Sequence, residues 1–266
     1  MCGRYASSRR PEDLVEEFEI DKVEVKETLP PDYNVAPTKQ VYAVVERTPR
    51  AGAEEGAAPP PERQLRTVKW GLVPFFAKDP SIGNRMINAR METVHEKPSF
   101  RRAFASRRCL LPADGYFEWY PTEQRTAAGK PAKQPFFIHP ADGAVMAMAG
   151  LYEIWRDPTR DEDDPLRFLW TCTVLTTTAE DSVGHIHDRM PLLVEPDRYS
   201  AWLDPSKADV EELKKLLVPA APGRLEAYPV STQVNNVRNN GPELLDPLDA
   251  EPRAGRQSEP QSAPQS

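Results

Sequence analysis

The stretch "FLWTCTVLTTTA" (Phe168–Ala179) is a long run of apolar, aromatic and β-branched residues, which are the types enriched in β-strands. Four further runs of the same character are "AVMAMAGLYEIW" (144–155), "PFFIHP" (135–140), "QLRTVKWGL" (64–72) and "VYAVVE" (41–46). They do not alternate regularly with helical segments, and the sequence contains no repeat. The pattern therefore predicts one α+β domain with a mixed, mostly antiparallel sheet that curls toward a barrel.

Helix signals are fewer and lie between these runs. Residues 10–18, "RPEDLVEEF", begin with proline and acidic residues, and residues 97–108, "KPSFRRAFASRR", end in arginines. Residues 204–217, "DPSKADVEELKKLL", have apolar side chains at helical spacing. These three segments are expected to be peripheral helices.

Segments rich in proline, glycine, alanine or charge predict where the chain leaves the sheet. They are expected to form flexible insertions at about 50–64, 122–134 and 156–166, and a disordered C-terminal tail at 249–266. Such compositions bury too little apolar surface to offset the entropy lost on ordering. The folded domain is accordingly expected to span residues 2–248.

Composition narrows the class of protein. The chain has 266 residues, 39% of them hydrophobic, and a net charge of -7. It lacks an apolar run of roughly 18–20 residues and a signal-peptide pattern, so a cytoplasmic protein without membrane contact is expected. The three cysteines are odd in number and have no CxxC or nearby histidine spacing, which argues against a disulfide scaffold and a zinc site. No metal or organic cofactor is predicted.

Cys2 directly follows the initiator methionine, in "MCGRYA". A free cysteine is often a small buried hydrophobic residue, and this is the ordinary interpretation. Removal of Met1, however, would leave an α-amine and a thiol on one residue. The amine attacks an aldehyde to give an imine, and the thiol then adds to the same carbon, which closes a thiazolidine ring. Cys109 and Cys172 lie within apolar runs and are expected to be core.

Three motifs supply candidate partners for Cys2. Strand alternation in "GYFEWY" puts Glu118 and Tyr116 on one face, where Glu118 is either solvated or held in a cavity with a shifted pKa. "GHIHDRMP" carries His187, which is either a structural loop histidine or an acid/base group. "INARMET" places Asn88 and Arg90 on one strand face, an amide for orienting and a guanidinium suited to phosphate.

The segment 84–108 is basic within an acidic chain. It holds seven Lys/Arg and two Glu, a local charge of +5. With Trp70, Phe75, Phe76 and Trp119 nearby in the predicted strands and loops, it fits a groove that holds a phosphate backbone and stacks bases on aromatic rings. The competing interpretation is a solvated helix face. The residues alone thus predict an N-terminal nucleophile with an anionic substrate.

Seven motifs in chain order resemble the SRAP family of SOS response-associated peptidase-like proteins, over about residues 2–248. They are "MCGRYA" (1–6), "YNVAPT" (33–38), "WGLVP" (70–74), "INARMET" (87–93), "FRRAFASRRCLLPADGYFEW" (100–119), "IHDRMP" (186–191) and "VSTQVNNVRNNGPELL" (230–245). The family includes proteins that process abasic sites in bacteria and in eukaryotes. The insertions and the tail match none of its elements.

The resemblance implies a barrel-like SRAP fold and a defined chemistry. Cys2 would crosslink covalently, as a thiazolidine, to the ring-opened aldehyde of an abasic site in single-stranded DNA, including single-strand/duplex junctions. Asn88 would orient the Cys2 amine, Glu118 would move protons between that amine and the opening sugar, and His187 would assist as acid/base on the deoxyribose. The protein would protect such sites during the DNA damage response and would associate with the nucleoid when bound.

The resemblance also implies a set of DNA contacts. Arg4, Asn34 and Arg90 match backbone-binding positions, and the loops carrying Pro37 and Trp70 match elements that wedge against flanking duplex. Lys97 is a less secure match, since Lys97 and Pro98 stand where some members have an arginine. The chain is expected to be a bacterial monomer, and replication machinery is a further candidate partner.

Two other classes of function stay open at this level. One class is an enzyme that catalyses a different reaction. It is either a cysteine peptidase that removes its own Met1 with Cys2 and His187, or a lyase in which the imine undergoes β-elimination. The other is a non-enzymatic binder of single-stranded or modified DNA. Position two distinguishes them, because a binder would tolerate alanine there.

Overall fold

Strand β11 (Phe168–Thr178) is the centre of the fold seen in a computed structural model, which describes residues 2–49 and 59–248. It pairs antiparallel with β10 and β12 and parallel with β5 and β6. The chain of neighbours β11-β10-β7-β4-β5 returns to β11, so five strands close into a ring. The β5–β11 closure is short, with Lys69 and Trp70 opposite Thr171 and Cys172.

The remaining elements complete this barrel and the structures around it. The other strands are β1 (Tyr5–Ser7), β2 (Lys22–Glu24), β3 (Asp32–Val35), β4 (Gln40–Arg47), β5 (Glu62–Trp70), β6 (Asn88–Arg90), β7 (Arg108–Ala113), β8 (Gly115–Arg125), β9 (Pro131–Pro140), β10 (Met146–Arg156), β12 (Arg189–Pro191) and β13 (Leu225–Pro229). The α-helices are α1 (Pro11–Glu17), α2 (Arg101–Ser106), α3 (Asp181–Gly184), α4 (Tyr199–Leu203) and α5 (Val210–Lys214). Four 3-10 turns are η1 (Pro80–Arg85), η2 (Pro196–Arg198), η3 (Thr232–Asn235) and η4 (Pro242–Leu245).

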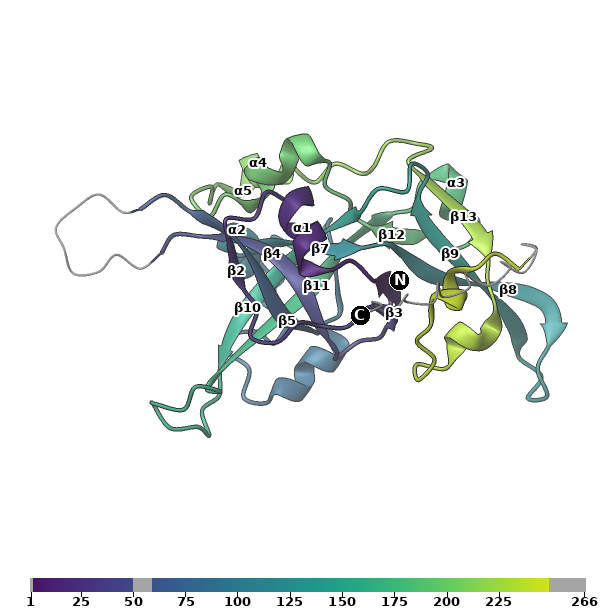
Figure 1. Cartoon of the computed structure of the whole chain (residues 1–266), viewed down its shortest axis with the longest axis horizontal. Coiled ribbons are helices and arrows are strands. Elements are labelled where there is room, and N and C mark those ends of the chain that lie inside the picture. The colour runs from purple at the N-terminus through teal and green to yellow at the C-terminus, as the bar shows by residue number, and fades with distance from the viewer. Residues whose placement is uncertain (1, 50–58, 249–266) are drawn as a thin grey trace, which may run out of the picture.

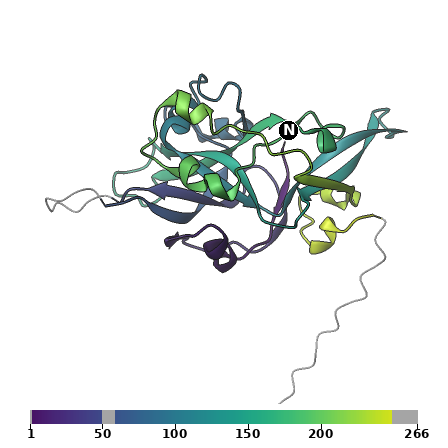
Figure 2. The ribbon, with the colours of Figure 1, turned by 90° about the horizontal axis from the view of Figure 1, so that it is seen from above.

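A second sheet of five strands has the order β13-β9-β8-β1-β3. It lies beside the barrel, with the β8–β9 hairpin extending away from it (Figure 1). The purple N-terminal strand runs along the junction between the barrel and the second sheet in both views (Figures 1 and 2). This arrangement brings the residues just before β1 to the boundary between barrel and second sheet.

Strand alternation separates the apolar side chains into distinct cores. Val41, Ala43 and Val45 of β4 belong to one cluster with Trp70 and Cys172, which fills the barrel. The intervening Tyr42 and Val44 belong to a second cluster, which also contains side chains from α1, α2 and α4. A third, smaller core packs Phe117 and Phe137 of the second sheet against residues of η3 and η4.

The predicted fold class is confirmed, since nine strand pairings are antiparallel and three are parallel. The helices α1, α2 and α5 also fall within the three segments predicted to be helical. Cys109 and Cys172 are both fully buried, as expected.

The insertions need correction in two places. Residues 122–134 are not an insertion outside the sheet, because β8 runs to Arg125 and β9 starts at Pro131, so both flanks are paired strand. Likewise β5 begins at Glu62, inside the segment 50–64. Composition is misleading here because cross-strand backbone pairing needs few apolar side chains. Residues 156–166 connect β10 to β11, while 50–58 and the tail 249–266 lie outside the described residues.

Helices in the described part of the chain are all too short or too polar to cross a membrane.

Candidate active site

Cys2 lies three residues before β1, at the junction of the two sheets. The antiparallel β1–β8 register sets Tyr5 opposite Tyr116, and the Phe117 amide donates to the Arg4 carbonyl at 2.9 Å. This pairing carries the residues before Arg4 alongside Glu118. The Cys2 side chain is fully buried and belongs to the core cluster of the barrel.

Asn88 holds the backbone of Cys2. It is the first residue of β6, which lies parallel to β11 with Asn88 opposite Val174. Its Nδ2 donates to the Cys2 carbonyl oxygen at 2.8 Å. Within the described residues, its Oδ1 is buried and accepts no hydrogen bond. The amide therefore fixes Cys2 with one end and presents a buried acceptor with the other.

Glu118 is a buried carboxyl, not a solvated one. It is 5% exposed, in the part of β8 where Tyr116 joins the barrel core and Phe117 joins the third core. The alternation predicted for "GYFEWY" is thus confirmed. Burial raises the pKa of Glu118 above its ordinary value, and the nearby His187 partly opposes that rise.

The Cys2 thiol is held in its neutral form. Burial raises its pKa well above the ordinary value, and the negative charge of Glu118 raises it further. A thiol in this setting is a poor nucleophile until a neighbouring group accepts its proton. Cys2 and Glu118 are therefore electrostatically coupled, which matters for the order of any reaction.

His187 stands in the loop between α3 and β12, with 31% of its side chain exposed. Its Nδ1 lies 3.0 Å from the Arg189 amide, a donor, and 2.9 Å from Asp188 Oδ1, an acceptor. The amide contact requires Nδ1 without a proton, whereas the carboxylate contact requires Nδ1 with a proton. The backbone contact is the more constrained, because the Asp188 side chain is 86% exposed. We therefore assign Nδ1 as the acceptor and place the proton on Nε2.

Arg189 anchors the loop that carries His187, through partners that the sequence alone could not identify. Its guanidinium forms a two-pronged pair with Glu92, at 2.6 and 3.0 Å, and donates to the Thr176 carbonyl at 2.6 Å. Glu92 follows β6, which begins with Asn88. The signal in the sequence was the presence of Glu92 in "INARMET" and Arg189 in "HDRMP", but only the fold pairs them.

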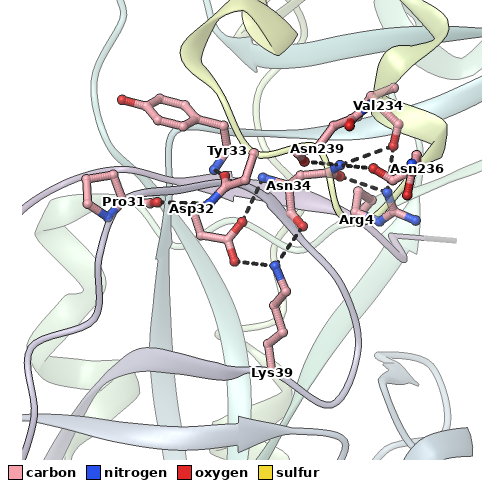
Figure 3. A network of polar contacts seen from close by, with 10 residues as sticks. Arg4, Pro31, Asp32, Tyr33, Asn34, Lys39, Val234, Asn236 and Asn239 are labelled. Carbon is pink, nitrogen blue, oxygen red and sulfur yellow. Dashed lines mark hydrogen bonds and ion pairs between the residues drawn. The ribbon is translucent and has the colours of Figure 1, made fainter.

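Asn34 is a structural clamp in this conformation. It is fully buried, and its Nδ2 donates to the carbonyls of Val234, Asn236 and Asn239 at 2.9–3.2 Å (Figure 3). Its Oδ1 accepts from Arg4 at 2.7 Å. Both polar atoms of the amide are therefore engaged within the protein, and the contact of Asn34 with DNA stays a prediction.

Arg4 is shared between this clamp and the surface. Its guanidinium also donates to the Val234 carbonyl at 2.8 Å and lies 5.7 Å from the ring centroid of Trp119. Burial lowers its pKa, while the charge of Asp32 opposes the change. Arg4 is half-buried and stays cationic, so it can present positive charge beside the Trp119 ring.

Trp70 cannot act as a wedge through its own side chain. It is fully buried, donates from Nε1 to the Ile87 carbonyl at 2.9 Å, and meets the Tyr5 ring edge-on at 5.1 Å. The exposed rings are those of the following loop, since Phe75 and Phe76 are 49% and 50% exposed. The sequence indicates both as stacking candidates, along with Trp70, and the resemblance matches the loop that carries Trp70 to a wedge element.

The other three expected DNA contacts lie at accessible positions. Pro37 is half-buried, in the turn before Thr38, whose amide donates to the Trp70 carbonyl at 2.9 Å. Arg90 and Lys97 are exposed. Strand β6 sets Arg90 two residues from Asn88 and so on the same face, as predicted.

The cationic side chains of residues 84–108 are of two kinds: some bind other groups of the protein, and the others are exposed to solvent. Arg107 pairs with Glu153. Arg108 is 2% exposed and donates to five backbone carbonyls, and its burial lowers its pKa to about 10. Five cations of the segment remain exposed, namely Arg85, Arg90, Lys97, Arg101 and Arg102. The described residues contain no cluster of three or more potential metal ligands.

These features define an α+β barrel protein in which the backbone of Cys2 meets the Asn88 amide, and its thiol is influenced by the buried carboxyl of Glu118. The family model described as "SOS response associated peptidase (SRAP)" matches residues 1–237. The chain belongs to this family.

Relatives and solved structures agree with that assignment. The chain is 38% identical to "Abasic site processing protein YoqW" of Bacillus subtilis (strain 168), over 92% of this chain and 99% of the relative. It is 32% identical to "Abasic site processing protein YedK" of Escherichia coli (strain K12), over 93% and 100%. A crystal structure of a protein from Bacteroides thetaiotaomicron matches with a TM-score of 0.73 at 23% identity, over 92% of this chain and 99% of the other, which supports the fold.

Proposed function

We propose that this chain processes abasic sites in single-stranded DNA by capturing them covalently on Cys2 after Met1 has been removed. The observation that carries the proposal is the contact between Asn88 and the Cys2 backbone, with the buried Glu118 alongside. The names of the relatives supply the substrate class, because they are described as abasic site processing proteins.

The buried thiol suggests the order of bond formation. The free α-amine of Cys2, with a reference pKa of about 8, attacks the C1′ aldehyde of the ring-opened sugar. Loss of water gives an imine. The thiol sulfur then adds to the same carbon while its proton passes to the imine nitrogen, and the thiazolidine closes. The adduct therefore equals protein plus DNA minus one water.

Each neighbouring residue has a role in this sequence. The open Oδ1 of Asn88 accepts a hydrogen bond from the Cys2 amine and aims its lone pair. Glu118, whose pKa is raised by burial, donates a proton to the departing hydroxyl group and later carries the thiol proton to the imine nitrogen. His187, protonated on Nε2, acts on the deoxyribose hydroxyls. These role assignments are proposals.

The DNA strand follows the accessible cationic side chains and the exposed aromatic rings. Arg90 and Lys97 contact phosphates, and Arg4 adds positive charge next to Trp119. Phe75 and Phe76, exposed in the loop after Trp70, take the wedge role together with Pro37. Asn34 supports this surface indirectly, by holding the Val234–Asn239 segment in place.

A general cysteine peptidase is less well supported. Such enzymes need a thiolate, and both burial and Glu118 raise the pKa of the Cys2 thiol. A lyase outcome stays connected to the main proposal through the shared imine. In Cys2→Ser, which lacks the thiol, we expect β-elimination to replace ring closure and strand breaks to increase. An unchanged number of breaks would contradict a shared imine.

The decisive experiment is intact mass spectrometry of the purified protein before and after incubation with single-stranded DNA that carries one abasic site. We expect a mature chain without Met1 and a denaturation-stable adduct of the stated mass. Cys2→Ala should abolish the adduct and retain salt-sensitive DNA binding. DNA with a tetrahydrofuran analogue, which has no aldehyde, is the matched substrate control. A mature Cys2 that forms no adduct would refute covalent capture and favour a plain DNA binder.

A further inference from the structure

A cavity of about 460 Å³ lies at the end of the barrel away from Cys2. Strands β5 and β11 pair at residues 69–70 and 171–172, whereas the first half of β5 pairs with β2 instead. The N-terminal halves of β5 and β11 are therefore not paired with each other, and they line a cavity. Trp170 in its wall is four residues from Val174, the β11 partner of Asn88, which corresponds to about 13 Å along the strand.

The cavity has two chemically different walls. One is formed by apolar and aromatic side chains of β10 and β11, namely Ile154, Phe168 and Trp170. Phe168 is 54% exposed, and the Arg167 guanidinium lies 6.0 Å from its ring centroid, so the ring stays largely open to solvent. The other wall, from β4 and β5, carries the guanidinium groups of Arg47 and Arg66.

Both guanidinium groups are held over one indole. The Arg47 and Arg66 Cζ atoms lie 5.0 and 4.5 Å from the ring centroid of Trp170. Tyr152 stacks on the same indole, with ring centroids 5.4 Å apart and an interplanar angle of 9°. Cation–π contacts and stacking therefore fix Trp170 and hold two positive charges close together.

The positive charges at this wall are incompletely compensated. Burial lowers the pKa of Arg66, Glu24 opposes that change, and the charge of Arg47 lowers the pKa further. Glu24 is 3.9 Å from Arg66 but 2.6 Å from Lys22, so it is shared. The lining as a whole contains three cations and two carboxylates. A bound anion would relieve the repulsion between the two guanidiniums.

We propose that this cavity binds a nucleoside phosphate, with the phosphate between Arg47 and Arg66 and the base against Phe168 and Ile154. Guanidinium pairs suit phosphate oxygens, and an exposed phenyl ring beside an apolar wall suits the face of a base. The volume lies in the range of small-molecule sites, roughly 300–1,000 Å³. The ligand is either a free nucleotide or a nucleotide within single-stranded DNA. The site is separate from Cys2 and does not require covalent capture.

Calorimetric titration of the full chain at low ionic strength tests the proposal, with dAMP, deoxyadenosine and inorganic phosphate as probes. We expect dAMP to bind more tightly than either fragment, because only dAMP engages both walls. Arg47→Ala should weaken dAMP binding roughly tenfold or more, since a charged hydrogen-bonding partner is lost. Arg156→Ala is the matched control: Arg156 is the last residue of β10 and does not line the cavity.

A short oligodeoxyadenylate without an abasic site distinguishes the two sources. If its affinity also falls in Arg47→Ala, the site takes nucleotides within a strand, and if only dAMP binding falls, it takes free nucleotides. The proposal is overturned if wild-type protein does not bind dAMP, or if Arg47→Ala and Arg156→Ala behave alike. Thermal unfolding checks that each variant is folded. Arg47→Lys, which keeps the charge and loses the planar fork, should bind dAMP with intermediate affinity.

Discussion

Two asparagines of this chain, Asn34 and Asn88, look equivalent in the sequence but differ in how completely their amides are bonded. The amide of Asn34 donates to three carbonyls and accepts from Arg4, so its polar atoms are all engaged. The amide of Asn88 donates to Cys2, while its Oδ1 is buried without a partner among the described residues. A saturated network gives rigidity, whereas the unpaired buried acceptor of Asn88 is the atom to which we assign the Cys2 amine in the proposed reaction.

The largest effect should come from the acid/base residues around Cys2. Glu118→Gln and His187→Ala should each slow crosslinking to abasic DNA by about 10²–10⁴-fold, because each removes a proton-transfer group. The two profiles should differ: Glu118→Gln slows both formation and reversal of the thiazolidine, while His187→Ala mainly slows sugar opening. Single-turnover crosslinking and reversal assays measure both. Identical profiles would contradict separate roles.

The next effect contrasts the two asparagines directly. Asn34→Ala should lower the free energy of unfolding by about 3 kcal/mol, because it leaves Arg4 and several carbonyls without their partner. Asn88→Ala should cost only about 1 kcal/mol in stability but slow crosslinking. Urea unfolding and a crosslinking assay on both variants check this pair. Equal stability losses would remove the distinction between clamp and reactive site.

A smaller effect concerns the pH dependence of stability. Burial raises the folded-state pKa of Glu118 above its unfolded value of about 4.3. The protonated carboxyl thus contributes stability that is complete below about pH 4.3 and is lost as the pH rises through the folded pKa. The difference in stability between wild type and Glu118→Gln should fall over that window, by at most about 1.4 kcal/mol per pH unit. Urea unfolding at several pH values measures it, and parallel curves would show that Glu118 is not buried as an acid.

The family motifs identified the segments that form the candidate site, but they did not determine which side chains of those segments are exposed. The motifs placed Asn88 and Glu118 near Cys2 through the resemblance to a family, since local sequence cannot bring together residues 86 or more positions apart. They matched the loop that carries Trp70 to a DNA-facing element, and in that segment the Trp70 ring lies in the core while Phe75 and Phe76 are exposed. A motif marks a segment, but only packing determines which side chain of that segment faces out.

The sequence by itself determined the strand-rich α+β class, the helical segments and the position, at residue two, of the cysteine that we propose as nucleophile. These depend on local propensity, periodicity and chain position. The tertiary structure alone decided the closure of the barrel by β5 and β11, the Arg189–Glu92 anchor, the saturation of Asn34 and the cavity of Arg47, Arg66 and Trp170. The physical reason is that each of these joins residues tens of positions or more apart in the chain, and such pairings are set by packing and long-range strand register.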